Sequence, residues 1–228
     1  MSVPVKIDFV SDVACPWCAV GLKSLQAAIA RVGDELEVEL RFQPFELNPQ
    51  MPAEGEDTVE HLTRKYGITS EQVALNGEAI RARGAELDFE FRMDRRRHMY
   101  NTFDAHRLLH WAESQGEGRQ LALKEALLRA YFTDGQDVSS TEVLVDLAES
   151  TGLDGARARQ ILASDEYAEA VREKQRFYRE QGISAVPSVI FNGRHLLQGG
   201  QPVELFERAL RQLSGVQAPA AGENAARA

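Results

Sequence analysis

Two cysteines, Cys15 and Cys18, are separated by Pro16 and Trp17, and they are the residues of this sequence best suited to redox chemistry. Such a pair can cycle between a dithiol and a disulfide, and the thiolate is the nucleophile in that exchange. A structural disulfide between them would close a very short loop and add little stability. The chain contains no other cysteine. We therefore expect a redox centre in a reducing compartment.

A zinc site is the second interpretation of the same cysteines. His106 and His110 are four residues apart on an expected helix, so that they and the cysteine pair would supply four ligands. Their separation in sequence is much longer than in a zinc finger. A third interpretation is that both cysteines simply pack as small apolar residues. We favour the dithiol and expect no metal.

The elements around the dithiol predict a βαβ unit. Residues 5–9 alternate between apolar and polar side chains as in a half-buried strand, and a helical apolar pattern runs from Pro16 to Gly33. Residues 36–42 alternate again and predict a second strand. Cys15 would be the N-cap of the helix, where the helix dipole lowers the pKa of a thiol. We expect Cys15 to be an exposed nucleophile and Cys18 to lie deeper and resolve the mixed disulfide.

The end of the chain predicts a ββα unit. Two short apolar segments, 188–191 and 195–198, flank the turn Asn192-Gly193, and an amphipathic helix ends near Leu213. The order βαβ…ββα is that of a thioredoxin-like α/β fold. Pro187 precedes the first of these strands, where its missing N–H is tolerated. Spacing alone leaves its peptide isomer open.

The middle of the chain predicts a large all-helical insertion. Helical patterns cover about 58–66, 70–84, 99–114, 118–132, 141–150 and 156–163, and a helix over 166–181 returns to the sheet. Capping boxes are predicted at Thr69 with Gln72 and at Ser139 with Glu142. We expect a discontinuous thioredoxin-like domain of residues 1–50 and 164–213, a helical insertion domain of residues 51–163, and a disordered tail over residues 214–228.

These features together resemble the DsbA family and, within it, the FrnE-like cytoplasmic subgroup. The resemblance rests on residues 8–12 before the dithiol, 42–49 after the second strand, 101–108 in the insertion and 182–202 near the end. It implies a thiol–disulfide oxidoreductase or isomerase that forms mixed disulfides with protein or small-molecule substrates. It also implies a cis Val186–Pro187 bond beside the cysteines, with Pro16, Trp17 and the backbone of Val186 forming the active-site loop and the substrate-binding surface.

The sequence departs from strongly oxidising family members in two ways. The residues between the cysteines are Pro-Trp rather than Pro-His, and no second cysteine pair is present. Electrons would therefore come from a separate partner, glutathione or a thioredoxin system, and no prosthetic cofactor is expected. A net charge of −9 and the lack of a long apolar run argue against nucleic acid and membranes as partners. With no evident signal peptide, we expect a cytoplasmic location.

Several polar residues are weaker candidates. Asp12 could accept the proton of Cys18 through water, or it could cap the turn that leads to the helix. Asn101 and His106 are expected to line a cleft. A cluster of arginines is expected either to form a solvated face or to bind an acidic group such as a glutathione carboxylate. The cluster consists of Arg92, Arg95, Arg96 and Arg97.

Two other functions share this architecture. Glutathione-dependent enzymes of the 2-hydroxychromene-2-carboxylate isomerase and kappa-class transferase types have serine where Cys15 stands, and they need no resolving thiol. A non-catalytic redox-sensing module would keep the fold without turnover. The presence of both Cys15 and Cys18 favours the oxidoreductase.

Overall fold

The computed structural model describes residues 5–213, and the predicted tail lies outside the described residues. Its main sheet has four strands in the order β2-β1-β5-β6, with β1 at Val5–Ser11, β2 at Val38–Pro44, β5 at Ser188–Phe191 and β6 at His195–Gln198. Strand β1 pairs parallel with β2 and antiparallel with β5. The predicted thioredoxin-like α/β fold is confirmed.

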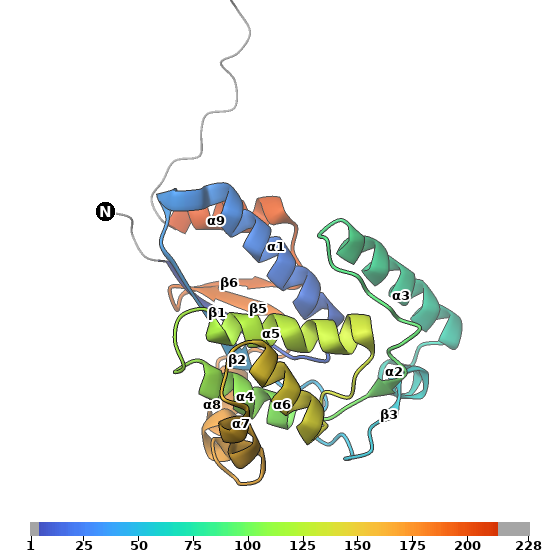
Figure 1. Cartoon of the computed structure of the whole chain (residues 1–228). Helices are drawn as coiled ribbons and strands as arrows, with labels where there is room; N and C mark the ends of the chain where they lie inside the picture. The colour runs from blue at the N-terminus through green and yellow to red at the C-terminus, as the bar shows by residue number, and fades with distance from the viewer. Residues whose placement is uncertain (1–4, 214–228) are drawn as a thin grey trace, which may run out of the picture.

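Helices cover both faces of this sheet. Helix α1 (Pro16–Val32) links β1 to β2 and packs beside α9 (Val203–Leu213) on one face, whereas α8 (Ala168–Glu180) contacts β2 from the other side (Figure 1). A short 3-10 turn, Gly33–Glu35, follows α1. Because the Leu36 N–H caps this turn by donating to the Gly33 carbonyl at 3.5 Å, β2 begins two residues later than predicted, at Val38.

The segment between β2 and α8 is largely helical, as predicted. Its helices are α2 (Thr58–Tyr66), α3 (Ser70–Ala85), α4 (Phe103–Ala112), α5 (Arg119–Arg129) with a π-helical turn at Ala130–Asp134, α6 (Thr141–Ser150) and α7 (Gly155–Leu162). It also contains a small antiparallel sheet of β3 (Glu56–Asp57) and β4 (His98–Met99). Because His98 and Met99 pair with β3, α4 starts at Phe103 rather than at Met99.

The two predicted capping boxes have different outcomes. The box of Thr69 with Gln72 is present at the start of α3. The box at Ser139 is wrong, because Ser140 is the N-cap of α6 and makes no side-chain capping bond. Ser139 instead bonds to Asp137 through both its backbone N–H and its hydroxyl.

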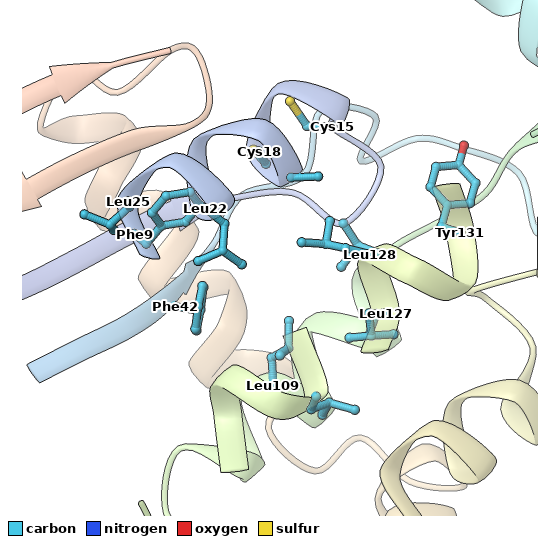
Figure 2. Packing of buried hydrophobic residues seen from close by; sticks show 14 of the residues in the cluster. Phe9, Cys15, Cys18, Leu22, Leu25, Phe42, Leu109, Leu127, Leu128 and Tyr131 are labelled. Carbon is cyan, nitrogen blue, oxygen red and sulfur yellow. The ribbon is translucent and has the colours of Figure 1, made fainter. Parts of the chain in front are cut away.

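The helical segment and the sheet share one hydrophobic core. Phe9 on β1 and Phe42 on β2 pack edge to face with ring centroids 5.7 Å apart, and Leu109 from α4 and Leu127 from α5 belong to the same buried cluster (Figure 2). The side chain of Gln120 on α5 also binds β2 directly. Its Oε1 accepts from the Phe42 N–H at 2.9 Å, and its Nε2 donates to the Phe42 carbonyl at 3.1 Å. The edge of the sheet is therefore completed by a helix of the insertion.

Candidate active site

Cys15 lies at the N-cap of α1, as predicted. Its backbone N–H donates to the carbonyl of Asp12 at 3.3 Å, and its own carbonyl accepts from the Cys18 N–H at 3.0 Å. Pro16 occupies the first position of the helix, where its missing N–H costs nothing. Both thiols are free. The local sequence thus places a thiol at the positive end of a helix.

The loop before β5 comes against this helix start. The Cys15 Sγ donates to the carbonyl of Val186 at 3.5 Å, and the Val186–Pro187 peptide bond is cis. The Pro187 carbonyl accepts from the Gly199 N–H at 2.8 Å. A Cβ added at Gly21 on α1 would lie 3.0 Å from Pro187 Cγ. The proline ring therefore rests on the helix so closely that a side chain at position 21 would crowd it.

Both cysteines are buried, whereas Trp17 between them is exposed. Cys15 is only 4% exposed, so the expectation of an exposed nucleophile is wrong, and Cys18 is 0% exposed. The reason is that the Cys15 thiol turns toward the Val186 carbonyl rather than toward solvent. Trp17 is the exposed residue of the motif, at 41%. It lies against Gly200, where an added Cβ would be 3.1 Å from its ring.

The two thiols have pKa values shifted in opposite directions. A hydrogen bond from the Cys18 thiol lowers the pKa of Cys15, and backbone N–H groups at the start of α1 add to the effect. Burial raises the pKa of Cys18 well above its usual value, and the nearby Cys15 sulfur raises it further. Cys15 is therefore the thiol that ionises first, whereas Cys18 keeps its proton.

Asp12 is buried next to the cysteine motif, and both oxygens of its carboxylate accept hydrogen bonds. Its Oδ2 accepts from the Leu47 N–H at 2.7 Å, its Oδ1 accepts from the Ala14 N–H at 3.3 Å, and His106 Nε2 is 3.4 Å from Oδ1. Burial alone would raise the pKa of Asp12, but His106 and the Leu47 N–H outweigh it and the pKa is lowered. These contacts match the predicted role in capping the turn.

Asn101 and His106 lie in different places. Asn101 donates to the Met51 carbonyl at 3.2 Å and accepts from the Phe103 N–H at 2.9 Å, so it supports the start of α4. It also lines a surface hollow that includes Asp104 and Arg172. His106 is buried and faces Asp12. The structure thus separates the two residues that the sequence analysis placed together.

The basic run at residues 92–97 is not a uniform solvated face. Arg95 and Arg97 are exposed, but Arg96 is buried. Its guanidinium is 5.2 Å from the ring centroids of Tyr131 and Phe132, and it donates to the carbonyl of Ala14 at 3.4 Å. Arg96 therefore braces the residue that precedes Cys15.

The zinc interpretation finds no support. Within residues 5–213, no group of three or more His, Cys, Asp and Glu side chains is arranged to hold a metal ion. His106 and His110 instead line a small cavity together with Lys124 of α5.

Lys124 is the functional candidate that the sequence analysis missed. It is 0% exposed, and its Nζ has no hydrogen-bond partner among the described residues. Burial lowers the pKa of Lys124, against the pull of Cys18, Asp12 and Cys15. A signal was present in the sequence, because Lys124 shares a helical face with Leu127 and Leu128. A charge inside an apolar stripe is a candidate for a buried charge.

Comparison with known proteins agrees with this geometry. The family model for the DSBA-like thioredoxin domain matches residues 6–211. The chain belongs to this family. A Bacillus subtilis relative, the uncharacterized protein YwbO, is 30% identical over 211 residues, which is 92% of this chain and 96% of that protein. A crystal structure described as a "probable DsbA oxidoreductase" from Streptomyces coelicolor superposes with a TM-score of 0.86 at 34% identity, over 97% of this chain and 94% of the other.

More distant structures share the fold. The cytosolic disulfide reductase DsbM from Pseudomonas aeruginosa has a TM-score of 0.63 at 18% identity, over 91% of this chain and 98% of its own, and it has also been solved with GSH. A 2-hydroxychromene-2-carboxylate isomerase has a TM-score of 0.66 at 16% identity, over 93% and 100%. Within residues 5–213, no helix combines the length and apolarity that crossing a bilayer requires.

Proposed function

We propose that this DsbA-like protein is a thiol–disulfide oxidoreductase in which Cys15 attacks and Cys18 resolves. The observation that carries the proposal is the position of the two thiols. Cys15 lies at the N-cap of α1 against the Val186 carbonyl, and Cys18 is fully buried behind it. Opposite pKa shifts then give each thiol its own role.

The reaction proceeds in two exchanges. The Cys15 thiolate attacks one sulfur of a substrate disulfide, and the other substrate sulfur leaves as a thiolate. Cys18 then loses its proton and attacks the Cys15 sulfur, which releases the second substrate thiolate and closes the Cys15–Cys18 disulfide. The protein gives up two electrons, and the substrate disulfide is reduced by two electrons. The same steps in reverse transfer a disulfide to a dithiol substrate. In isomerisation, another thiolate of the substrate would attack the mixed disulfide instead of Cys18, which forms a new substrate disulfide and releases the Cys15 thiolate.

We propose that substrates bind over Trp17 and the loop at Val186 and Pro187. Trp17 offers exposed apolar surface beside the motif, and Val186 can offer its backbone to an extended chain or a small disulfide. Pro16 serves by starting the helix, because it presets φ directly after the nucleophile.

We propose glutathione as the electron partner, with the cytoplasm as the compartment and a thioredoxin system as the other possible donor. The support is the shared fold of DsbM, a cytosolic disulfide reductase whose structure includes GSH. The described residues contain no second cysteine pair that could relay electrons within the chain, so a separate thiol must restore the dithiol.

Mixed-disulfide trapping tests the mechanism. Incubated with oxidised glutathione, Cys18→Ser should gain a single glutathione adduct that a reductant removes, because no resolving thiol remains. The matched variant Cys15→Ser should gain none, and the wild-type protein should end as an intramolecular disulfide. Mass spectrometry under non-reducing conditions reads all three. A Cys15→Ser protein that still reduces insulin disulfides would contradict the proposed roles.

The same experiment distinguishes the proposed oxidoreductase from a glutathione-dependent isomerase. Such an enzyme binds glutathione without forming a disulfide to it. It would therefore show no adduct in Cys18→Ser while retaining noncovalent glutathione binding in Cys15→Ser. A redox-sensing module would form the intramolecular disulfide but would not catalyse insulin reduction.

A further inference from the structure

Four buried polar atoms belong to residues that line one small cavity; three have no polar partner in the described part of the chain, and the fourth, His106 Nε2, has only its 3.4 Å contact with Asp12. They are Gln43 Oε1 at the end of β2, His106 Nε2 and His110 Nδ1 on α4, and Lys124 Nζ on α5, and all four residues line the same space. The space available to the centre of a water molecule is about 10 Å³, which is close to what a single buried water needs. A buried water bonds to about three polar groups. The cavity is therefore built to bind water in contact with Lys124.

Lys124 also lies beside the dithiol. Cys18 of α1, Cys15 at its N-cap and Asp12 from the turn after β1 interact with it electrostatically, and His106 and His110 of α4 line the cavity with it. Helices α1 and α5 face each other here, since Lys23 on α1 pairs with Glu125 on α5 at 2.5 Å. Leu128, one turn along α5, points toward the helix that carries Cys18 (Figure 2). Lys124 is thus positioned to act on the buried thiol.

Resolution of the mixed disulfide requires a group that accepts the proton of Cys18. Cys18 is fully buried, so its proton cannot pass directly to bulk water. Asp12 is held by two backbone N–H groups and by His106, so its carboxylate is committed elsewhere. The remaining basic group is Lys124, which interacts electrostatically with Cys18 without a hydrogen bond to its sulfur and lines a water-sized cavity.

We propose that Lys124 and its cavity carry the proton of Cys18 during resolution. This inference rests on the proposed two-step exchange. Lys124 in its amine form accepts the Cys18 proton through water, the Cys18 thiolate forms the bond to Cys15, and the Cys15–substrate bond breaks with the electron pair leaving on the substrate sulfur. The Lys124 ammonium then passes its proton to water in the cavity. His110 lines the same cavity, is half-buried, and packs on Tyr167 with ring centroids 5.3 Å apart.

Dithiobis(nitrobenzoate) separates the two steps in one experiment. The reduced protein should release coloured thionitrobenzoate in a first phase, when Cys15 forms the mixed disulfide, and in a second phase, when Cys18 resolves it. The first-order rate of the second phase, measured against pH, reports the deprotonation of Cys18. A wild-type protein without a second phase would refute the proposed function itself.

Lys124→Met removes the acceptor and keeps the length of the side chain. At about pH 7 we expect the second phase to slow by about tenfold, which corresponds to one pKa unit, and to approach the wild-type rate at high pH. The first phase should stay within about twofold. The control is Lys23→Met, which removes the ion pair with the neighbouring Glu125 and leaves the cavity intact. It should leave the second phase and its pH profile unchanged.

A purely structural role for Lys124 gives a different pattern. A packing defect would slow the second phase equally at every pH, and that result would overturn the proposal, as would a profile for Lys124→Met that matches Lys23→Met. Lys124→Gln is the second variant if the methionine variant does not fold, since it keeps a polar group toward the cavity. The same shift in pH profile is expected for it.

Discussion

Gly21→Ala tests whether the dithiol helix and the Pro187 loop are in as close contact as the structure shows. The new Cβ would lie 3.0 Å from Pro187 Cγ, 3.6 Å from Gly200 Cα and 3.7 Å from the end of the Phe9 ring. Carbon atoms prefer separations of about 3.5–4.0 Å. The Pro187 ring must therefore retreat, and it is held by the bond from Gly199 to its carbonyl.

Two opposing effects set the size of the change. Overpacking a well-filled site costs about 1–3 kcal/mol. Alanine in place of glycine in a helix interior returns about 1 kcal/mol. The net loss of stability for Gly21→Ala is therefore about 0–2 kcal/mol. The matched control is Gly77→Ala in α3, where the new Cβ meets only Met93 Cγ at 3.7 Å. It should gain about 1 kcal/mol.

Thermal and urea unfolding of both variants decide the question. The two free energies of unfolding should differ by about 1–3 kcal/mol, which is a Tm difference of about 2–12 °C for a chain of this size. Gly21→Ala should also slow insulin reduction, since the displaced loop moves the Val186 carbonyl away from Cys15. Equal stability of the two variants would refute the contact between Gly21 and Pro187, and with it the argument that the proline loop is seated on α1.

Two further variants test the support of the site. Gln120→Ala leaves the Phe42 N–H and carbonyl without the Gln120 side chain and should lower the free energy of unfolding, measured in urea, by about 2–4 kcal/mol. The control Gln115→Ala, at an exposed position, should leave that free energy almost unchanged. Equal losses of stability in the two variants would contradict the pairing of Gln120 with Phe42. Asp12→Asn should lower the free energy of unfolding by about 3 kcal/mol at neutral pH. The control Asp146→Asn, at an exposed position, should leave it almost unchanged. Because the folded-state pKa of Asp12 is lowered, its carboxylate stabilises the fold above about pH 4 and this contribution is lost as the pH falls. The difference in unfolding free energy between wild type and Asp12→Asn should therefore become smaller at acidic pH. A difference that does not change with pH would contradict the lowered pKa of Asp12.

The elements of the fold were predictable because their signals are local. Alternation identified β1, proline at the first helical position located the start of α1, and Thr69 with Gln72 marked the start of α3. The dithiol was predictable because its two residues are adjacent on one helical turn. Boundaries were less accurate where backbone pairing competes with helical pattern, as at Met99, which joins β4 instead of α4.

Contacts between distant segments were not predictable in this way. Nothing near Arg96 in the sequence shows that it reaches the carbonyl of Ala14, and its neighbours Arg95 and Arg97 are exposed as expected. The Cys15 thiol is buried because a carbonyl 171 residues away in the chain accepts from it. Side-chain type gave these residues a possible chemistry, whereas only the packing of the insertion against the sheet gave them partners.

The position of Lys124 gives the insertion a role beyond covering the sheet. Gln120 fixes α5 on β2 by two hydrogen bonds to Phe42 and on α4 by a third, to the Leu109 carbonyl at 3.1 Å. Lys124 is one turn further along the same helix, so the register that Gln120 sets also determines where the amine lies relative to Cys18. An apolar residue there would pack better, because burying an unpaired amine costs several kcal/mol. The chain nevertheless has a lysine at a buried position of α5 that interacts electrostatically with the resolving thiol. If Lys124 carries the proton of Cys18, loosening Gln120 should slow resolution as well as lower stability, which the two-phase thionitrobenzoate assay would detect in Gln120→Ala.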